Sequence, residues 1–172
     1  MNYSAIKGRD IANGYGVRVT LFVSGCTHHC KNCFNKETWD FNSGKPFTEE
    51  TINEIIELMA PSYITGLSLL GGEPMEKPNQ AGLLPLLKKV RETYPEKDIW
   101  CYSGYLLEDL LEGGRVRTDI TDEVLSYIDV LVDGEFQEEL YSIMLKFRGS
   151  ANQRVIDLKE TLKSGEIKLL LE

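Results

Sequence analysis

The sequence has no long apolar run and fewer basic than acidic residues, and each shortage excludes a class of protein. No stretch approaches the roughly 18 consecutive apolar residues that a membrane-spanning helix needs. Residues 1–10 are polar and lack an apolar segment, so no secretory signal is expected. The 19 basic residues are outnumbered by 27 acidic ones, giving a net charge of −8, and proteins that bind nucleic acid through its phosphates usually carry the opposite balance. We therefore expect a cytoplasmic protein that binds neither nucleic acid nor membrane.

Length and composition indicate one globular domain over residues 1–172. Hydrophobic residues make up 42% of the chain and charged residues 27%, which is ordinary for a folded domain. The length is too short for two comfortable domains. No repeat, low-complexity tract or flexible linker divides the sequence.

Short apolar strands alternate with amphipathic helices. Strands are expected at residues 16–24, 64–70, 98–102, 128–132 and 167–171. Helices are expected between Thr48 and Pro61, at 83–94, at 106–112, after Thr121 and at 155–163. This alternation predicts parallel strands with right-handed crossovers. At about 30 residues per unit the chain cannot close an eight-fold barrel of about 250 residues, so we predict an α/β fold, an open partial (β/α) barrel of five or six parallel units.

The chemically distinctive residues each follow a predicted strand. They are the cysteines of residues 25–35, the turn at residues 71–74, Ser103 with Gly104, and Asp133 with Gly134. Ligands of parallel α/β sheets bind at the carboxyl ends of the strands. We therefore expect these loops to surround one site.

Three of the four cysteines, Cys26, Cys30 and Cys33, lie in the loop of residues 25–35. A disulfide scaffold would instead spread an even number of cysteines through a secreted chain. Cysteine thiolates hold iron–sulfur clusters, and a four-iron cluster normally takes four of them. Three ligands would leave one iron open to bind something else. The spacing C-x3-C-x2-C therefore predicts an iron–sulfur site.

Zinc is the alternative, and it prefers four closed ligands in a structural site. The fourth could be Cys101, or His28 or His29 from the loop itself. Cys101 lies within a predicted strand, where a buried free cysteine is common. We expect both histidines to be exposed polar residues of the loop.

The turn Gly71-Gly72-Glu73-Pro74 follows a predicted strand directly. Paired glycines tolerate positive φ and let a ligand approach the backbone. In isolation this segment would be a simple turn before a helix. Beside a loop of three cysteines, its backbone and carboxylate suit the ammonium group of an amino-acid-like ligand.

These motifs resemble those of the radical S-adenosylmethionine enzymes, with the CxxxCxxC motif at residues 26–33 and the GGE motif at residues 71–73. Within that superfamily the chain is similar to the family that activates anaerobic ribonucleoside-triphosphate reductases. The similarity covers residues 14–35, LLGGEP at 69–74 and FRGSANQRVIDL at 147–158. Many superfamily members have an aromatic residue before the third cysteine, whereas here Asn32 precedes it and Phe34 follows it.

The resemblance implies a radical oxidoreductase. A [4Fe-4S] cluster on the three cysteines would bind the amino and carboxylate groups of S-adenosylmethionine and cleave its sulfonium reductively. The resulting 5′-deoxyadenosyl radical would take a hydrogen from a glycine Cα of the partner reductase. The electron would come from an external donor such as a flavodoxin. The cofactor carries the hard chemistry, so no catalytic residue is expected beyond the cluster.

The resemblance also implies which residues contact the cofactors. Asn32, Cys33 and Phe34 would border the ligand, and Gly71, Gly72 and Glu73 would meet its methionine end. Ser103 and Asp133 would supply polar contacts to the ligand or to an associated cation, although Asp133 is equally explained as a turn aspartate.

Four further residues are open to two interpretations. Arg148, Gln153 and Arg154 could contact the ligand's carboxylate or the partner's glycine loop, or they could be a solvated segment. Trp39 is expected to pack rather than to take part in chemistry.

Three alternative functions remain at this point. Two are enzymatic: the activation of another glycyl-radical enzyme, and small-molecule radical chemistry of the deazapurine-synthase type. The FRGSANQR segment argues against both. The third is a zinc-binding module, which would be colourless and would hold one zinc.

Overall fold

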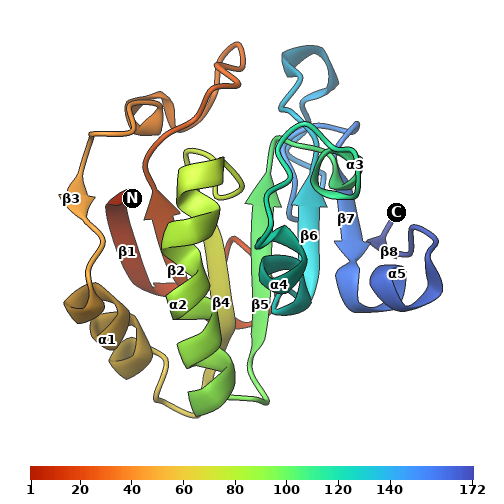
Figure 1. Cartoon of the computed structure of the whole chain (residues 1–172). Helices are drawn as coiled ribbons and strands as arrows, with labels where there is room; N and C mark the ends of the chain where they lie inside the picture. Colours follow the sequence, from red (N-terminus) through yellow and green to blue (C-terminus); the bar gives the residue numbers. More distant parts are fainter.

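The computed structural model describes residues 1–172, and its strands form one open eight-stranded sheet (Figure 1). The strand order is β3-β1-β2-β4-β5-β6-β7-β8. In chain order the strands are β1 (Asn2–Asp10), β2 (Val17–Val23), β3 (Lys45–Pro46), β4 (Ile64–Gly71), β5 (Asp98–Ser103), β6 (Val130–Asp133), β7 (Arg154–Asp157) and β8 (Leu169–Leu171). The helices are α1 (Glu49–Leu58), α2 (Lys77–Thr93), α3 (Leu107–Leu110), α4 (Thr121–Ser126) and α5 (Leu158–Ser164). The predicted α/β class is confirmed.

Only the central strands β2, β4, β5 and β6 run parallel to one another, and the other neighbours pair antiparallel. The predicted five or six parallel units were therefore too many. Strand β1 forms a hairpin with β2, and no long helix returns the chain to the far end of the sheet between β6 and β7. Gln153 Nε2 donates to the Gly134 carbonyl at 3.0 Å, which holds the start of β7 beside the end of β6.

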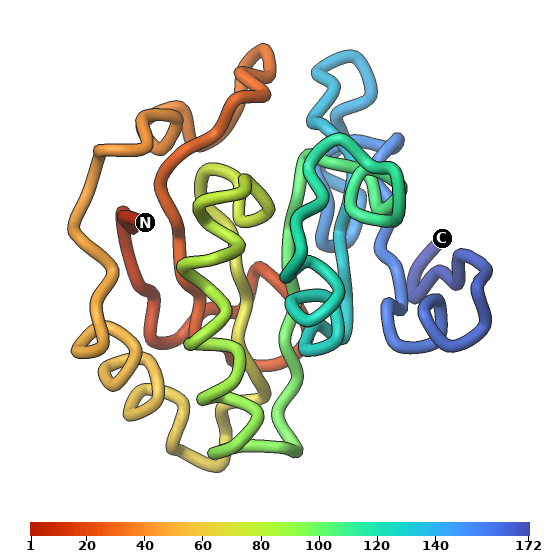
Figure 2. Tube along the Cα trace, viewed as in Figure 1, coloured from red at the N-terminus to blue at the C-terminus, as the bar shows by residue number.

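The two faces of the sheet are packed differently. Helices α1, α2 and α4 cover one face (Figure 1), and 25 buried residues form the core on that side. A smaller cluster on the other face consists of Trp100, Val130, Val132 and Val155, with Tyr102 and Phe147 against it. The cysteine loop and the segment of residues 134–153 lie beyond the carboxyl ends of the parallel strands (Figure 2).

The local predictions succeed at α1 and fail at β7. Thr48 caps α1, as predicted, by accepting a hydrogen bond from the Thr51 N–H. The helix predicted at residues 155–163 begins only at Leu158, where the Asp157 side chain caps it. Val155 and Ile156 belong to β7, and their side chains enter the two different apolar clusters. This alternation is that of a buried strand.

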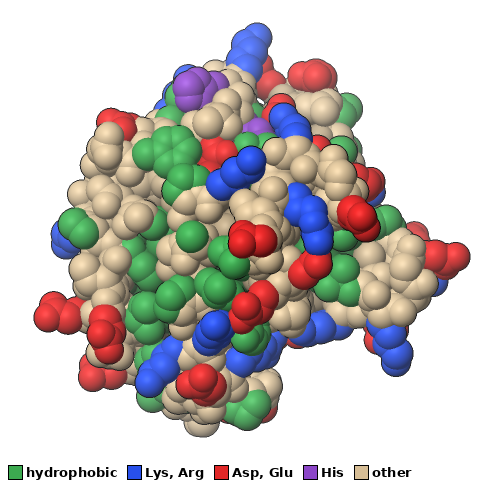
Figure 3. All heavy atoms as spheres, viewed as in Figure 1, with side chains coloured by type: hydrophobic (Ala, Val, Ile, Leu, Met, Phe, Trp, Pro, Cys, Tyr) green, Lys and Arg blue, Asp and Glu red, His purple; other side chains and the backbone are tan.

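No helix is both long and apolar enough to cross a membrane. Acidic and basic side chains are interspersed over the helix-covered face (Figure 3). That face therefore carries no single continuous basic patch.

Candidate functional site

A cavity of about 400 Å³ opens at the carboxyl ends of the parallel strands. All three cysteines of the loop line it, together with the Gly71–Glu73 turn and Ser103. Part of its remaining wall comes from the segment of residues 134–153, which folds over the same end of the sheet. The predicted convergence of the cysteine, glycine and serine loops on one site is confirmed.

The cysteine loop has the donors that an iron–sulfur cluster needs. Cys26, Cys30 and Cys33 are free thiols. Backbone N–H groups face the sulfurs: that of His28 faces Cys26, and that of Asn35 donates to Cys33 Sγ at 3.4 Å. Such N–H···S hydrogen bonds tune protein-bound clusters. The three thiols therefore fit a cluster of this type.

Burial disfavours the thiolate form of two of the loop cysteines. Burial raises the pKa of Cys26 to about 12, and burial and the charge of Glu135 raise the pKa of Cys30. Formation of the thiolates that a cluster needs would therefore release protons from Cys26 and Cys30.

Close contact between two strand ends explains the paired glycines. A Cβ at Gly71 would lie 2.2 Å from the Val23 carbonyl oxygen, and one at Gly72 would lie 2.6 Å from the Gly25 carbonyl oxygen. The Glu73 N–H donates to that same Gly25 carbonyl at 2.7 Å. The glycine turn therefore supports the first residues of the cysteine loop directly.

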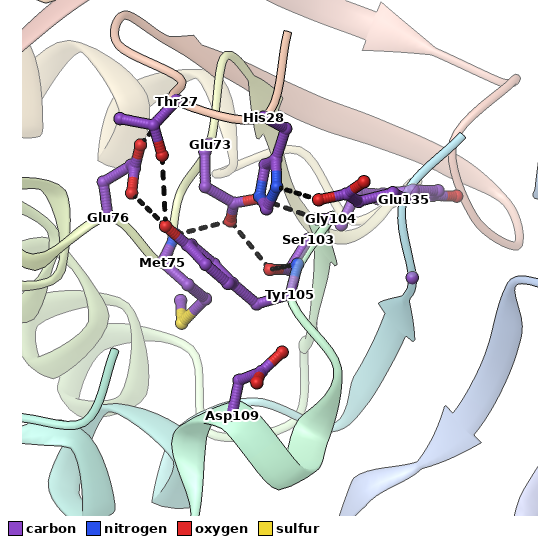
Figure 4. A network of polar contacts seen from close by, with 12 residues as sticks. Thr27, His28, Glu73, Met75, Glu76, Ser103, Gly104, Tyr105, Asp109 and Glu135 are labelled. Atoms are coloured by element: carbon purple, nitrogen blue, oxygen red, sulfur yellow. Dashed lines mark hydrogen bonds and ion pairs between the residues drawn. The ribbon is translucent and has the colours of Figure 1, made fainter. Parts of the chain in front are cut away.

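The carboxylate of Glu73 is saturated by hydrogen bonds within the protein (Figure 4). Its Oε1 accepts from the Gly104 N–H at 2.6 Å and faces His28 Nε2 at 2.9 Å. Its Oε2 accepts from the Met75 N–H at 2.8 Å and from Ser103 Oγ at 2.7 Å. The side chain is 1% exposed. Glu73 therefore joins three loops of the site.

The expectation that both histidines are exposed is wrong for His28. Its ring lies between Glu73 and Glu135, with Nδ1 2.8 Å from the Glu135 carboxylate. Burial lowers the pKa of His28, but the two carboxylates outweigh it and raise the pKa above its ordinary value. His29 is exposed, and its ring stacks on that of Trp39 with the two ring centroids 4.4 Å apart. Because both nitrogens of His28 face carboxylates, it has none free for zinc.

Glu76 and Tyr105 form a second support that sequence reasoning missed (Figure 4). Glu76 accepts a hydrogen bond from the Thr27 N–H at 2.7 Å and another from the Tyr105 hydroxyl at 2.5 Å. The Tyr105 ring packs against the His28 ring, with the two ring centroids 4.4 Å apart. A second glutamate, two residues after GGEP, was the only signal in the sequence. Both carboxylates near this turn thus hold the cysteine loop.

The predicted ligand contacts Asn32 and Asp133 lie outside the cavity lining. Asn32 is exposed and its side-chain amide donates to Glu138. Asp133 is fully buried, and its carboxylate accepts hydrogen bonds from Arg154 and the Leu107 N–H. Their contact with the ligand stays a prediction, and the hydrogen bonds of Asp133 are those of a structural ion pair.

Phe34 does line the cavity, and its exposed ring packs against Phe136 at 5.1 Å. Cys101 does not line the cavity, because it lies fully buried in the core on the helix side of the sheet. It is therefore a structural cysteine and not a fourth ligand beside the loop.

Three residues that were expected to pack, or whose roles the sequence left open, also line the cavity. Trp39, Arg148 and Gln153 do so, and Tyr102 does so without having been predicted. Tyr102 shares its face of β5 with Trp100, while Ile99 and Cys101 face the helices. The alternation in residues 99–102 is the signal that could have placed Tyr102 toward the site.

Comparison with known proteins agrees with this geometry. Residues 12–156 match the family model described as a 4Fe-4S single cluster domain. The chain is 44% identical over 155 residues to the anaerobic ribonucleoside-triphosphate reductase-activating protein of Pasteurella multocida, covering 89% of this chain and 95% of that protein. It is 42% identical over 161 residues to the protein of that name from Escherichia coli K12, covering 92% and 100%. The corresponding values for the protein of Enterobacteria phage T4 are 41% over 155 residues, 90% and 93%. The chain therefore belongs to the family of anaerobic ribonucleoside-triphosphate reductase-activating proteins, within the radical S-adenosylmethionine enzymes.

Proposed function

We propose that this protein generates a glycyl radical on the anaerobic ribonucleoside-triphosphate reductase, using S-adenosylmethionine and a [4Fe-4S] cluster. The observation that carries the proposal is the convergence of three free thiols and the glycine turn on one cavity. Its volume of about 400 Å³ lies within the range of small-molecule sites, about 300–1,000 Å³.

Cys26, Cys30 and Cys33 would hold the cluster. When bound, it would supply the electron for reductive cleavage of the C5′–S bond of S-adenosylmethionine, and with it the radical chemistry at the glycine Cα. The electron comes from an external protein donor such as a flavodoxin. Gly72 and Ser103 border the methionine end of the ligand, and Phe34 borders the open side. Glu73, with Ser103, His28 and the Gly104 N–H, keeps these loops in register around the ligand.

The reductase must bring its glycine to the mouth of this cavity. Phe34 is 65% exposed there, and Tyr141 lies 5.9 Å from it. Beyond Tyr141, Ile143 and Met144 are 80% and 87% exposed. Exposed apolar residues beside a ligand site indicate a protein-binding surface, so this rim receives the reductase.

We also propose that the open sheet is a partial barrel and that the chain forms one domain. Its edge strands β3 and β8 are not paired with each other, so a peptide can enter without crossing a closed wall. The free thiols suit the reducing cytoplasm, where we place the reaction.

The test is anaerobic cleavage of S-adenosylmethionine by protein with a reconstituted cluster. Dithionite is added, and 5′-deoxyadenosine is measured for the wild type and for Cys30→Ala. In parallel, the reductase is added and its glycyl-radical EPR doublet is recorded. Cleavage that needs Cys30, together with the doublet, supports the proposal. Stoichiometric zinc without cleavage would overturn the radical chemistry, and cleavage without the doublet would overturn the choice of substrate.

A further inference from the structure

Three polar atoms in the wall of the cavity are buried and have no hydrogen-bond partner. They are Trp39 Nε1, Tyr102 Oη and Arg148 Nε. Only one other buried side-chain atom of the chain, Asn79 Oδ1, is in this condition. Leaving such a group unpaired costs about 1–3 kcal/mol, so their concentration in one cavity points to a polar ligand that pairs with them.

Arg148 is the only lysine or arginine that lines the cavity. Its Nη1 donates to the Gln153 carbonyl at 2.7 Å. The Gln153 side chain in turn accepts a hydrogen bond from the Gly149 N–H at 2.8 Å and donates to Gly134. The FRGSANQR segment thus folds into a compact turn that fixes the arginine against the cavity.

The two arginines of this segment differ in their partners. Arg154 pairs with Asp133 at 2.5 Å and with Glu108 at 2.7 Å. Arg148 forms no ion pair with any carboxylate. Its positive charge is therefore left for an anionic group within the cavity.

The charges of S-adenosylmethionine decide which of its groups this cation takes. The sulfonium and the ammonium are both positive and are repelled by a guanidinium, whereas the carboxylate is the ligand's only anion. Hydrogen bonds between arginine and a carboxylate are charge-assisted and among the strongest in proteins.

We propose that Arg148 is the specificity-determining residue that binds the carboxylate of S-adenosylmethionine. The Trp39 N–H and the Tyr102 hydroxyl pair with other polar atoms of the same ligand. This inference rests on the proposed function, since it assumes that ligand, and it adds the residue that recognises the amino-acid end.

The test is an equilibrium binding measurement without reductant, so that no turnover occurs. Protein with a reconstituted cluster is titrated with S-adenosylmethionine and with S-adenosylmethioninamine, the analogue that lacks the carboxylate. Wild type, Arg148→Gln and Arg148→Lys are compared. Arg117→Gln serves as the matched control, because Arg117 is paired with Asp122 and does not line the cavity. Iron content and circular dichroism establish that each variant is folded and loaded.

We expect Arg148→Gln to weaken binding of S-adenosylmethionine at least tenfold and to leave binding of the analogue nearly unchanged. Arg148→Lys should fall between the wild type and Arg148→Gln, because it keeps the charge but loses the planar donors. Arg117→Gln should bind like the wild type. Unchanged binding of S-adenosylmethionine by Arg148→Gln, or an equal loss for both ligands, would overturn the inference.

A comparison within the wild type keeps the inference testable if an arginine variant does not fold. Wild-type protein that binds both ligands equally tightly recognises no carboxylate, which would refute the role of Arg148. Failure of the proposed function looks different, because the wild type would then neither bind nor cleave S-adenosylmethionine. Normal cleavage with unaltered binding by Arg148→Gln would refute only the present inference.

Discussion

His28 Nε2 lies 2.9 Å from the carboxylate of Glu73, and this contact joins the cysteine loop to the glycine turn. Both side chains are almost completely buried, at 4% and 1% exposed. The second ring nitrogen of His28 faces Glu135 in the segment that closes the cavity. One imidazole thus connects three parts of the site that are far apart in the sequence.

Glu73→Gln tests this connection. The amide keeps the shape but loses the negative charge, and it places an N–H₂ group against donors such as the Gly104 N–H and Ser103. We expect the free energy of unfolding to fall by about 2–3 kcal/mol, the value of a lost hydrogen bond to a charged group. Denaturant unfolding of the cluster-free protein measures it.

Glu166→Gln is the matched control, because Glu166 is a largely exposed carboxylate paired with Lys168. Exposed ion pairs contribute about 0–1 kcal/mol, so the control should remain close to the wild type. Equal stability of the two variants would contradict the connecting role of Glu73.

Gly71→Ala is expected to be far more damaging than Gly113→Ala. Both glycines have positive φ, +131° and +84°. A Cβ at Gly71 meets the Val23 backbone at 2.2 Å, whereas one at Gly113 meets nothing within 4 Å. Gly113→Ala therefore measures backbone strain alone, about 1–2 kcal/mol, and Gly71→Ala should lose more than about 3 kcal/mol because the clash is added. Thermal or denaturant unfolding gives both values, and similar losses would show that the close contact between β4 and β2 is unimportant.

Cys101→Ala separates the structural cysteine from the cluster ligands. Cys101 is fully buried on the helix side of β5, so its removal should leave the iron content per chain unchanged. The small cavity should cost about 1 kcal/mol of stability. Cys30→Ala, in contrast, should lose iron and the visible absorption of the cluster. Iron loss in Cys101→Ala equal to that in Cys30→Ala would show that Cys101 is a ligand.

The sequence predicted the elements that have strong local signals. The apolar runs of β4 and β5 and the Thr48 cap of α1 are local features, and each lies where it was predicted. Strand β1 was not predicted, because its sequence has no apolar run: most of its positions are half-buried or exposed, and it lies next to the short edge strand β3. Its pairing with β2 depends on tertiary contacts that composition does not encode.

The same distinction holds at the site. The cysteines and the glycine turn were predictable because their chemistry is written in short motifs. The burial of His28 was not, since it depends on Glu73 and Glu135, which are 45 and 107 residues away in sequence. The engagement of Asp133 by Arg154 likewise required knowing that β7 runs antiparallel beside β6.

The last prediction concerns pH and Asp10, which fixes the loop between β1 and β2. Its carboxylate accepts hydrogen bonds from Thr20 Oγ1 at 2.6 Å, the Ala12 N–H at 2.9 Å and Asn13 Nδ2 at 2.7 Å. Burial raises the pKa of Asp10, but these hydrogen bonds outweigh it and hold the pKa below its ordinary value. Ala12 and Asn13 line the cavity, so Asp10 also holds that part of its wall.

A lowered pKa in the folded state means that the ionised carboxylate stabilises the protein above the unfolded pKa of about 3.9. That stabilisation is lost as the pH falls through the folded pKa. Asp10→Asn should therefore be less stable than the wild type by about 1–3 kcal/mol at pH 7, and the difference should shrink as the pH falls below about 4. Urea unfolding at several pH values measures it, with Asp119→Asn, an exposed aspartate, as the control. A difference that stays constant across this range would show that Asp10 stabilises the loop by packing rather than by its charge.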